Sequence, residues 1–474
     1  MKKRKVVWSI ITLFLAFSIL LSQEVYAAEE DKGYIGHENS ITVNILPSTL
    51  KEKSTDLELS VGKNQMQFEK VILDINQDYD QKFGEKISRV CNDNSARSVN
   101  IYEDDLLLLN ELASLYNEGF LDKKMPDLSA IYNIENQARK ENMYLLQAWM
   151  YQTIISNSTD SILCESKIEI KNIDIAETGV REYVFQMIQD IESEGHKYST
   201  GNWCVVNIID GDLGPKIISV WVNDTTYLLT RDRMRNIILT KEFGDLADFL
   251  QKDIFNTIEQ SKNQMQNVSP IEDEKENEKE KVAVERARKT LVYDRNTVAE
   301  MAITYAINHN PRFYYYTVAE GGDCTNFISQ SIWQSPGWPF DKIGINESVK
   351  WSCKKENGKY YRETPSWSGV NEFYDYCRWN DNLSLAGTVY GISAKTSGYS
   401  YSNVQVGDII QFQNPYTNRW QHSMIVSGID SNTPNGIYLC GHGGDAQNEP
   451  LSVKLGEFQN RYRVIHINNY IVEY

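Results

Sequence analysis

The chain has 474 residues and a formal net charge of −17, with 65 acidic and 48 basic side chains. This length is sufficient for two or three domains. The acidic balance argues against nucleic acid as a partner, because a protein that binds phosphate backbones needs clustered lysine and arginine.

The first 27 residues have the pattern of a secretory signal peptide. Residues 2–5 are all basic, residues 6–21 are apolar, and residues 25–27 fit the small-residue cleavage rule. The apolar run is short for a membrane-spanning helix, which needs about 20 residues. We therefore expect a secreted, extracellular protein that associates with the cell wall, with an uncleaved anchor as the alternative. Removing this segment takes away four cations and Glu24, so the charge becomes about −20 (−17 − 3).

Residues 28–160 are expected to form a mainly helical region. Leucines recur near helical spacing from Asp104 to Ser156, with a break at residues 125–126 and a second helix from about Leu128 to Ile155.

Residues 161–260 are expected to form an α+β accessory region. Alternating or β-branched runs occupy residues 166–175, 179–191, 202–209 and 216–228. Helices followed by a curved antiparallel meander have the pattern of the cone-shaped NTF2 type. A spacer or wall-proximal role is the plain interpretation of this region, and a pro-region that shields a thiol is the alternative.

Residues 261–289 read as an acidic linker. The segment is dense in glutamate and lysine and has no apolar face before Val282, so it is typical of a solvated connection. A domain is therefore expected over residues 290–474. Its first element is an amphipathic helix over residues 294–308, whose apolar face indicates core packing.

The segment Gly321-Gly322-Asp323-Cys324 contains the main chemical signal. A Gly-Gly turn delivers a cysteine to a predicted helix, and an aspartate of the kind that caps helices precedes it. In the first turn of a helix, free backbone N–H groups and the helix dipole lower a thiol pKa. The adjacent Asp323 carboxylate acts in the opposite direction, so the thiol needs a base.

Two of the six histidines lie on a predicted hairpin. Strand-like runs at residues 422–427 and 437–442 flank a turn rich in Asp, Asn, Pro and Gly. If the hairpin is centred on that turn, His422 pairs with His442, and cross-strand neighbours on one face lie about 5 Å apart. A nucleophile, a base and a residue that orients the base are what cysteine catalysis requires. We therefore predict Cys324 as nucleophile, His422 as base and His442 as its orienter.

The stretch between the cysteine helix and the hairpin is rich in aromatic residues and loop formers. Any one of these aromatics is best explained as core, but as a group they are plausible walls of a substrate groove. We assign Asp323, Asn326, Trp367 and Trp420 to the substrate site, with Asn326 also expected to brace the loop because it points off the Cys324 face.

The remaining cysteines and histidines indicate no metal and no cofactor. No Cys-x-x-Cys and no His-x-x-x-His spacing occurs in the chain. The seven cysteines are an odd number, so at least one thiol is free or pairs between chains. With Cys324 free, Cys164–Cys204 and Cys353–Cys377 are conceivable disulfides.

The run from Gly321 to Gln330 resembles the signature of an amidase domain family of Gram-positive bacteria. Residues 293–306, 407–412 and 420–426 carry further parts of the resemblance, which covers roughly residues 290–474. That family is similar to the papain-like NlpC and CHAP cell-wall hydrolases, in which a helix-start cysteine attacks an amide and a strand histidine acts as base.

The resemblance implies an α+β protein with a papain-like C-terminal domain of helices and an antiparallel sheet. It implies the same roles for Cys324, His422 and, as third residue, His442, with Asp445 and Asn448 as alternatives for the third position. The expected function is hydrolysis of an amide bond through an acyl-thioester, in peptidoglycan or another peptide, by a monomer. A non-catalytic peptidoglycan-binding module and a cysteine acyltransferase are the alternatives.

Overall fold

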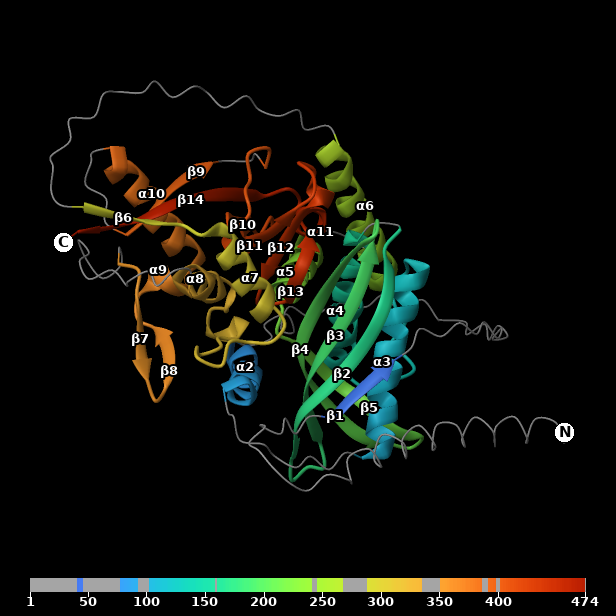
Figure 1. Ribbon diagram of the computed structural model, residues 1–474. Coiled ribbons are helices and arrows are strands. Elements are labelled where there is room, and N and C mark those ends of the chain that lie inside the picture. The colour runs from blue at the N-terminus through green and yellow to red at the C-terminus, as the bar shows by residue number, and fades with distance from the viewer. Residues whose placement is uncertain are drawn as a thin grey trace, which may run out of the picture. The chain divides into compact units, whose positions relative to one another are not determined.

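The computed structural model describes residues 41–45, 77–92, 102–157, 160–240, 245–266, 288–334, 350–385, 391–397 and 401–473 (Figure 1). All of them lie in one compact unit that begins at Ser40. The predicted signal peptide and most of the acidic linker fall outside the described residues. Among the helices in these ranges, none has both the length and the apolar character needed to span a bilayer.

The described residues form an α+β structure. The α-helices are α2 (Gln77–Asn92), α3 (Glu103–Asp122), α4 (Gln137–Ser156), α5 (Thr225–Thr240), α6 (Leu246–Gln266), α7 (Arg295–Tyr305), α8 (Cys324–Gln334), α9 (Pro365–Ser368), α10 (Val370–Leu385) and α11 (Leu451–Glu457). Short 3₁₀ helices are η1 (Val318–Glu320) and η3 (Pro434–Gly436).

A large antiparallel sheet joins twelve strands, and a separate hairpin joins two. The large sheet has the order β1-β2-β3-β4-β13-β12-β11-β10-β14-β6, with β5 paired to β4 and β9 paired to β14. Its strands are β1 (Ile41–Ile45), β2 (Ile162–Ile175), β3 (Arg181–Ser193), β4 (His196–Gly211), β5 (Gly214–Val222), β6 (Arg288–Val292), β9 (Gly391–Ser397), β10 (Ile409–Gln413), β11 (Trp420–Ile429), β12 (Ile437–Gly441), β13 (Asp445–Pro450) and β14 (Tyr462–Glu473). The hairpin consists of β7 (Cys353–Glu356) and β8 (Lys359–Arg362).

The N-terminal elements largely follow the sequence predictions. α3 ends near the predicted break, but α4 begins at Gln137 and not near Leu128, because the Asn136 side chain caps the helix by accepting a hydrogen bond from Arg139 N. The fourth predicted strand is shorter than expected. It ends at Val222, since the Asp224 carboxylate accepts the Thr226 N–H and starts a helix there.

In the C-terminal half, the sheet separates two hydrophobic cores. One core lies on the side of α7, α8 and α10 and includes Phe327, Ile425 and Cys440. The other lies on the side of α5 and α11 and includes Met424, Val426 and Leu439. Residues that alternate along β11 therefore enter different cores, as the pleat of a strand requires.

The sheet is continuous between the N-terminal region and the C-terminal half. β13 pairs with β4 through the positions Asp445↔Gly201, Ala446↔Thr200 and Gln447↔Ser199. In Figure 1, β4 lies beside β13, the strand that follows β12. The sequence division near residue 290 thus does not separate two independent sheets.

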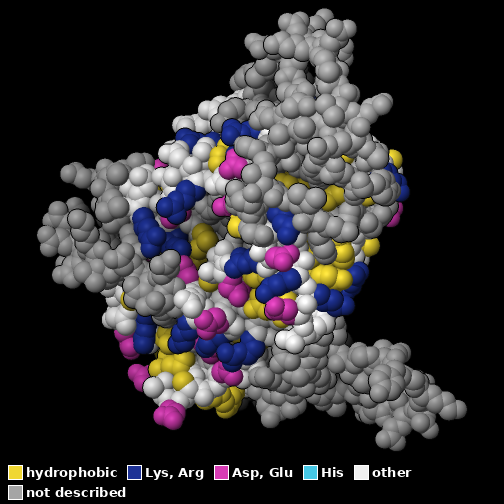
Figure 2. Space-filling model, turned by 90° about the vertical axis from the view of Figure 1, so that its left-hand side faces the viewer, with side chains coloured by type: hydrophobic (Ala, Val, Ile, Leu, Met, Phe, Trp, Pro, Cys, Tyr) yellow, Lys and Arg dark blue, Asp and Glu magenta, His cyan; other side chains and the backbone are white. Residues whose placement is uncertain are grey.

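Charged side chains of both signs are interspersed on the surface shown in Figure 2. In the coloured part of this face, lysines and arginines lie among aspartates and glutamates.

None of the seven cysteines, all of which lie in the described residues, forms a disulfide. The two disulfides considered from the sequence, Cys164–Cys204 and Cys353–Cys377, are therefore not formed. For Cys164 and Cys204 the reason is the strand order, because β3 lies between β2 and β4. Two strand spacings amount to about 9–10 Å, whereas disulfide-bonded Cα atoms lie within about 7 Å of each other. Cys353 and Cys377 are both buried in the core beside α8.

Candidate active site

Cys324 is the first residue of α8, as predicted. Gly321 and Gly322 have φ values of 101° and 83°, which residues with a side chain rarely adopt, so the turn into the helix depends on these glycines. Asp323 precedes the helix, but its carboxylate does not cap it. Its Oδ1 atom accepts hydrogen bonds from Tyr316 N and from the Asn326 side chain.

The Cys324 sulfur lies in a closed environment. The residue is only 4% exposed, and its Sγ atom is 3.8 Å from Thr325 Oγ1. Burial raises the pKa of the Cys324 thiol, while hydrogen bonds from the Thr325 side chain and the Ser423 backbone act in the opposite direction. In this arrangement the neutral thiol is favoured, and forming a thiolate requires help from a further group.

The hairpin that carries the two histidines differs in register from the prediction. At the turn, Ile429 pairs with Ile437, whereas the prediction placed residue 427 there. A shift of two residues in the strand pairing would leave each side chain on the predicted face of the sheet. A β-bulge between Val426 and Gly428 changes the pairing by one further residue, so the β11 side chains before the bulge lie on the opposite face. Ile425 consequently pairs with Cys440, one residue away from the register in which His422 would lie opposite His442.

His422 therefore lies on the face of the sheet away from α8. Its ring is parallel to that of Phe458 at 6.1 Å and lies 6.2 Å from the Phe412 ring. Ser423, the next residue, faces α8 instead and its hydroxyl lies 3.1 Å from Thr325 Oγ1. The predicted contact between His422 and His442 is wrong for this reason, and within the described residues no hydrogen bond joins either histidine to Cys324.

The environment of His422 disfavours proton transfer. Burial, aided by the Lys454 charge, lowers the pKa of His422 to about 3. Its Nδ1 atom is buried and has no hydrogen-bond partner among the described residues. A neutral ring stacked between phenylalanines is typical of a packing role.

We expect His422→Phe to retain both fold and activity. Phenylalanine preserves the ring stack and removes an unsatisfied buried nitrogen, whose desolvation costs about 1–3 kcal/mol. Thermal unfolding should show equal or higher stability, and turnover of an amide substrate should change by only a few-fold. A loss of the order of 10²–10⁴-fold, typical for removal of a general base, in a well-folded variant would instead support the sequence-based assignment.

His442 lies on the same side of the sheet as Cys324. Its ring is 4.1 Å from the Phe327 ring, one helical turn after Cys324, and its Nδ1 is 2.6 Å from Asp323 Oδ2. Its Nε2 is 2.7 Å from the Tyr305 carbonyl oxygen. Both partners are acceptors, so both ring nitrogens carry hydrogens and the ring is an imidazolium.

The electrostatics agree with a charged His442. Burial acts to lower the pKa of His442, but the hydrogen bond to Asp323, the charges of Asp445 and Asp323 and the Tyr305 carbonyl together raise it. His442 and Asp323 are each about 1% exposed, so they form a buried ion pair attached to the residue before Cys324.

A second histidine–aspartate pair lies beside the first. His309, in the loop after α7, is 2.8 Å from Asp445 Oδ2 through its Nε2, and its ring lies 4.6 Å from that of His442. His309 was not predicted from the sequence, because it does not lie in a segment with helix or strand periodicity. The scarcity of histidine in the chain was the one signal that pointed to it. His309, His442 and Asp445 could hold a metal ion, since each offers one ligand atom and these atoms lie within 4.8 Å of one another.

The other residues predicted for the site are mostly buried. Trp367 is 0% exposed, and its Nε1 donates to Asn326 Oδ1, so neither residue forms the wall of a groove in this structure. Asn326 braces the loop, as expected, by donating to the Tyr314 carbonyl. Trp420 is half-buried under the Arg463 guanidinium. Asn448, one alternative third residue, lies 3.9 Å from Cys440 Sγ and not at Cys324.

One protein-family model matches a segment in the C-terminal half of the chain. Residues 292–466 match the family model described as "Putative amidase domain". No curated protein and no solved structure matches the chain. The matched segment includes Cys324 and all the histidine–aspartate partners described above, and it supports hydrolase activity of the amidase type.

Proposed function

We propose that this protein is a cysteine-dependent amide hydrolase with Cys324 as the nucleophile. The observation that carries the proposal is the placement of Cys324 at the start of α8, within the matched amidase domain, beside the buried His442–Asp323 pair. The Ser423 backbone hydrogen bond to the sulfur adds a second favourable interaction for a thiolate.

In the proposed reaction, the Cys324 thiol first loses its proton to solvent, since the His442 imidazolium already carries a hydrogen on both ring nitrogens. The resulting thiolate attacks the amide carbonyl carbon and forms a tetrahedral intermediate. The carbon–nitrogen bond then breaks, and the departing amine takes a proton from the His442 imidazolium. Water attacks the acyl-thioester, His442 takes a proton from that water and becomes an imidazolium again, and the carboxylic acid and the Cys324 thiolate are released. Asp323 is a positioning residue, because its carboxylate holds Nδ1 of the ring.

This assignment gives His442 the role that the sequence analysis gave to His422. His442 shares a face of the sheet with α8, whereas His422 packs in the opposite core. Proton delivery requires His442 Nε2 to exchange its hydrogen bond with the Tyr305 carbonyl for one to the leaving nitrogen.

We further propose that the chain is exported and hydrolyses a peptide amide of the cell wall, through a papain-like domain. Support comes from the signal-peptide pattern of residues 1–27 and from the resemblance of the Gly321–Gln330 run to cell-wall hydrolases.

The test is digestion of purified peptidoglycan by the full chain, followed by mass analysis of the soluble fragments. We expect paired products with one new amine and one new carboxylate, and no such products with Cys324→Ala. The control is Cys440→Ala, since Cys440 is another buried thiol, lies in the core beside α8, and is not part of the proposed site. Turnover by a folded Cys324→Ala variant would disprove the proposal.

A further inference from the structure

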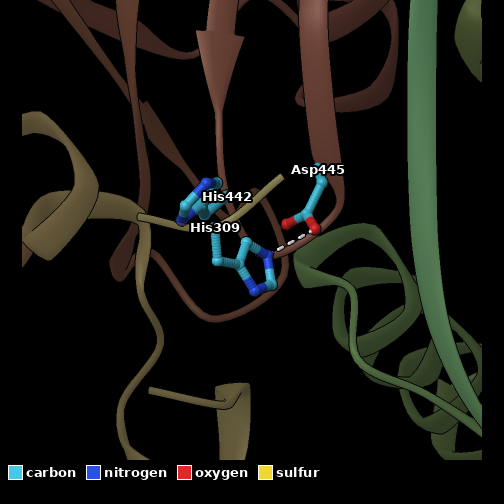
Figure 3. A group of neighbouring side chains, drawn as sticks. All are labelled: His309, His442 and Asp445. Atoms are coloured by element: carbon cyan, nitrogen blue, oxygen red, sulfur yellow. Dashed lines mark hydrogen bonds and ion pairs between the residues drawn. The ribbon is translucent and has the colours of Figure 1, made fainter. Parts of the chain in front are cut away.

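The cluster of His309, His442 and Asp445 brings together side chains from three separate segments (Figure 3). His309 lies in the loop after α7, His442 follows β12, and Asp445 begins β13. Each offers one ligand atom, and these atoms all lie within 4.8 Å of one another. We infer that these residues form a binding site for a divalent first-row transition metal ion such as Zn²⁺.

The donor set is suited to such an ion. Two imidazole nitrogens and one carboxylate oxygen are ligands that Zn²⁺ takes at about 2.0–2.2 Å. The three ligand atoms can reach those distances by movements of the cluster side chains alone. Two of these atoms, His309 Nε2 and Asp445 Oδ2, are already 2.8 Å apart. The His309 side chain is 12% exposed, which provides a route for the ion.

The surroundings already contain the outer contacts that orient metal ligands. A metal-bound histidine usually donates its other N–H to a carboxylate or a backbone carbonyl. His442 has one of each, Asp323 at Nδ1 and the Tyr305 carbonyl at Nε2, so whichever nitrogen binds the ion, the other keeps an acceptor. The His309 ring is held by stacking on Tyr315 at 3.8 Å, and Asp445 Oδ1 accepts from Gly443 N.

The charge balance also favours a divalent cation. Two buried carboxylates, Asp323 and Asp445, face this cluster and require positive charge nearby. A divalent ion bound by the cluster would balance the charge of both carboxylates.

The site lies where the two regions of the chain meet. Asp445 pairs with Gly201 of β4, and Trp203 of β4 lies 5.9 Å from the His309 ring. A bound ion would therefore tie the loop after α7 to the β12–β13 connection at this junction. If the proposed function is correct, the ion would also withdraw His442 from proton transfer and inhibit hydrolysis.

The test is a titration of the metal-free full chain with Co²⁺, which reports its own coordination through visible absorption. We expect about one equivalent of bound ion with nitrogen and oxygen ligands, competition by Zn²⁺, and a higher unfolding temperature. Asp445→Asn and His309→Ala should each weaken binding by at least about 10-fold, the lower end of the range seen even for outer-shell changes. The matched control is His466→Ala, because His466 forms a similar pair with Asp408 outside the cluster.

Binding that survives both cluster substitutions, or an absorption band from sulfur ligation by one of the cysteines, would overturn the inference. So would the absence of Co²⁺ binding by the folded wild-type chain. The outcome is independent of hydrolysis, since Cys324→Ala should bind the ion as the wild type does. Failure of the proposed function would leave this binding unchanged.

Discussion

A fragment of residues 285–474 should fail to form the native Cys324 site on its own. The contacts that hold the loop before α8 come partly from the N-terminal region. The Asn92 side chain bonds both to Tyr315 N and to the Tyr315 carbonyl, and Asn223 Oδ1 accepts from Val318 N. Removal of residues before 285 would also leave the edge of β13 without β4. Sequence organisation alone instead predicts that this fragment folds as an independent domain.

A buried group of four charged side chains makes the loss larger. Lys454 of α11 pairs with Glu449 and Glu457, and Asp224 of the N-terminal region adds a further negative charge to this buried group. Removing the N-terminal region would expose part of this charged group to solvent and would remove Asp224 from it. Breaking a buried ionic network typically costs about 3–5 kcal/mol, a large share of the stability of an ordinary domain.

The measurement compares three samples by circular dichroism melting and by the rate of Cys324 alkylation. They are the isolated fragment, the full chain, and a full chain cut at a protease site inserted in the acidic segment. We expect the cut halves to stay together on gel filtration and to behave like the full chain, whereas the fragment should be insoluble or lack a cooperative melt. A fragment that melts like the full chain and is alkylated at the same rate would show that β4 is dispensable.

Replacing His442 with alanine should affect both stability and turnover. The Asp323 carboxylate would remain buried without its ion-pair partner, which costs about 3–5 kcal/mol. If His442 is the proton donor, turnover of a peptide amide should also fall by the order of 10²–10⁴-fold. The double variant Asp323→Asn/His442→Gln should recover much of the stability but not the turnover.

The pH dependence separates these effects from a general loss of packing. Because the folded structure raises the pKa of His442, its contribution to stability is complete below its unfolded pKa of about 6.5 and is lost as pH rises through the folded value. The stability difference between wild type and His442→Gln, measured by urea unfolding, should therefore shrink as pH rises above about 6.5. A difference that stays constant over that window would mean that the ring is not charged in the folded protein.

The local parts of the site could be predicted from sequence, because short-range chemistry determines them. The Gly-Gly turn before Cys324 requires positive φ values, and the Asp294 side chain caps α7 through Thr297 N, so both helices begin where predicted. The register of the β11–β12 hairpin could not be predicted, since alternation is the same in either register and a single bulge after Val426 exchanges the faces. His309 was missed because its partner Asp445 lies 136 positions later in the chain.

The pairing of β4 with β13 has a consequence for how the chain reaches its folded state. Gly201 and Asp445 are 244 positions apart (445 − 201), so this part of the sheet can close only after nearly the whole chain is available. β5 pairs with β4 only from Cys204 to Gly211. Residues 199–201 of β4 therefore have no strand on that edge until β13 has been synthesised. Long-range pairing of this kind forms late, and an unpaired strand edge can recruit another chain in the meantime. Aggregation during synthesis should therefore depend on this short edge more than on the buried cores.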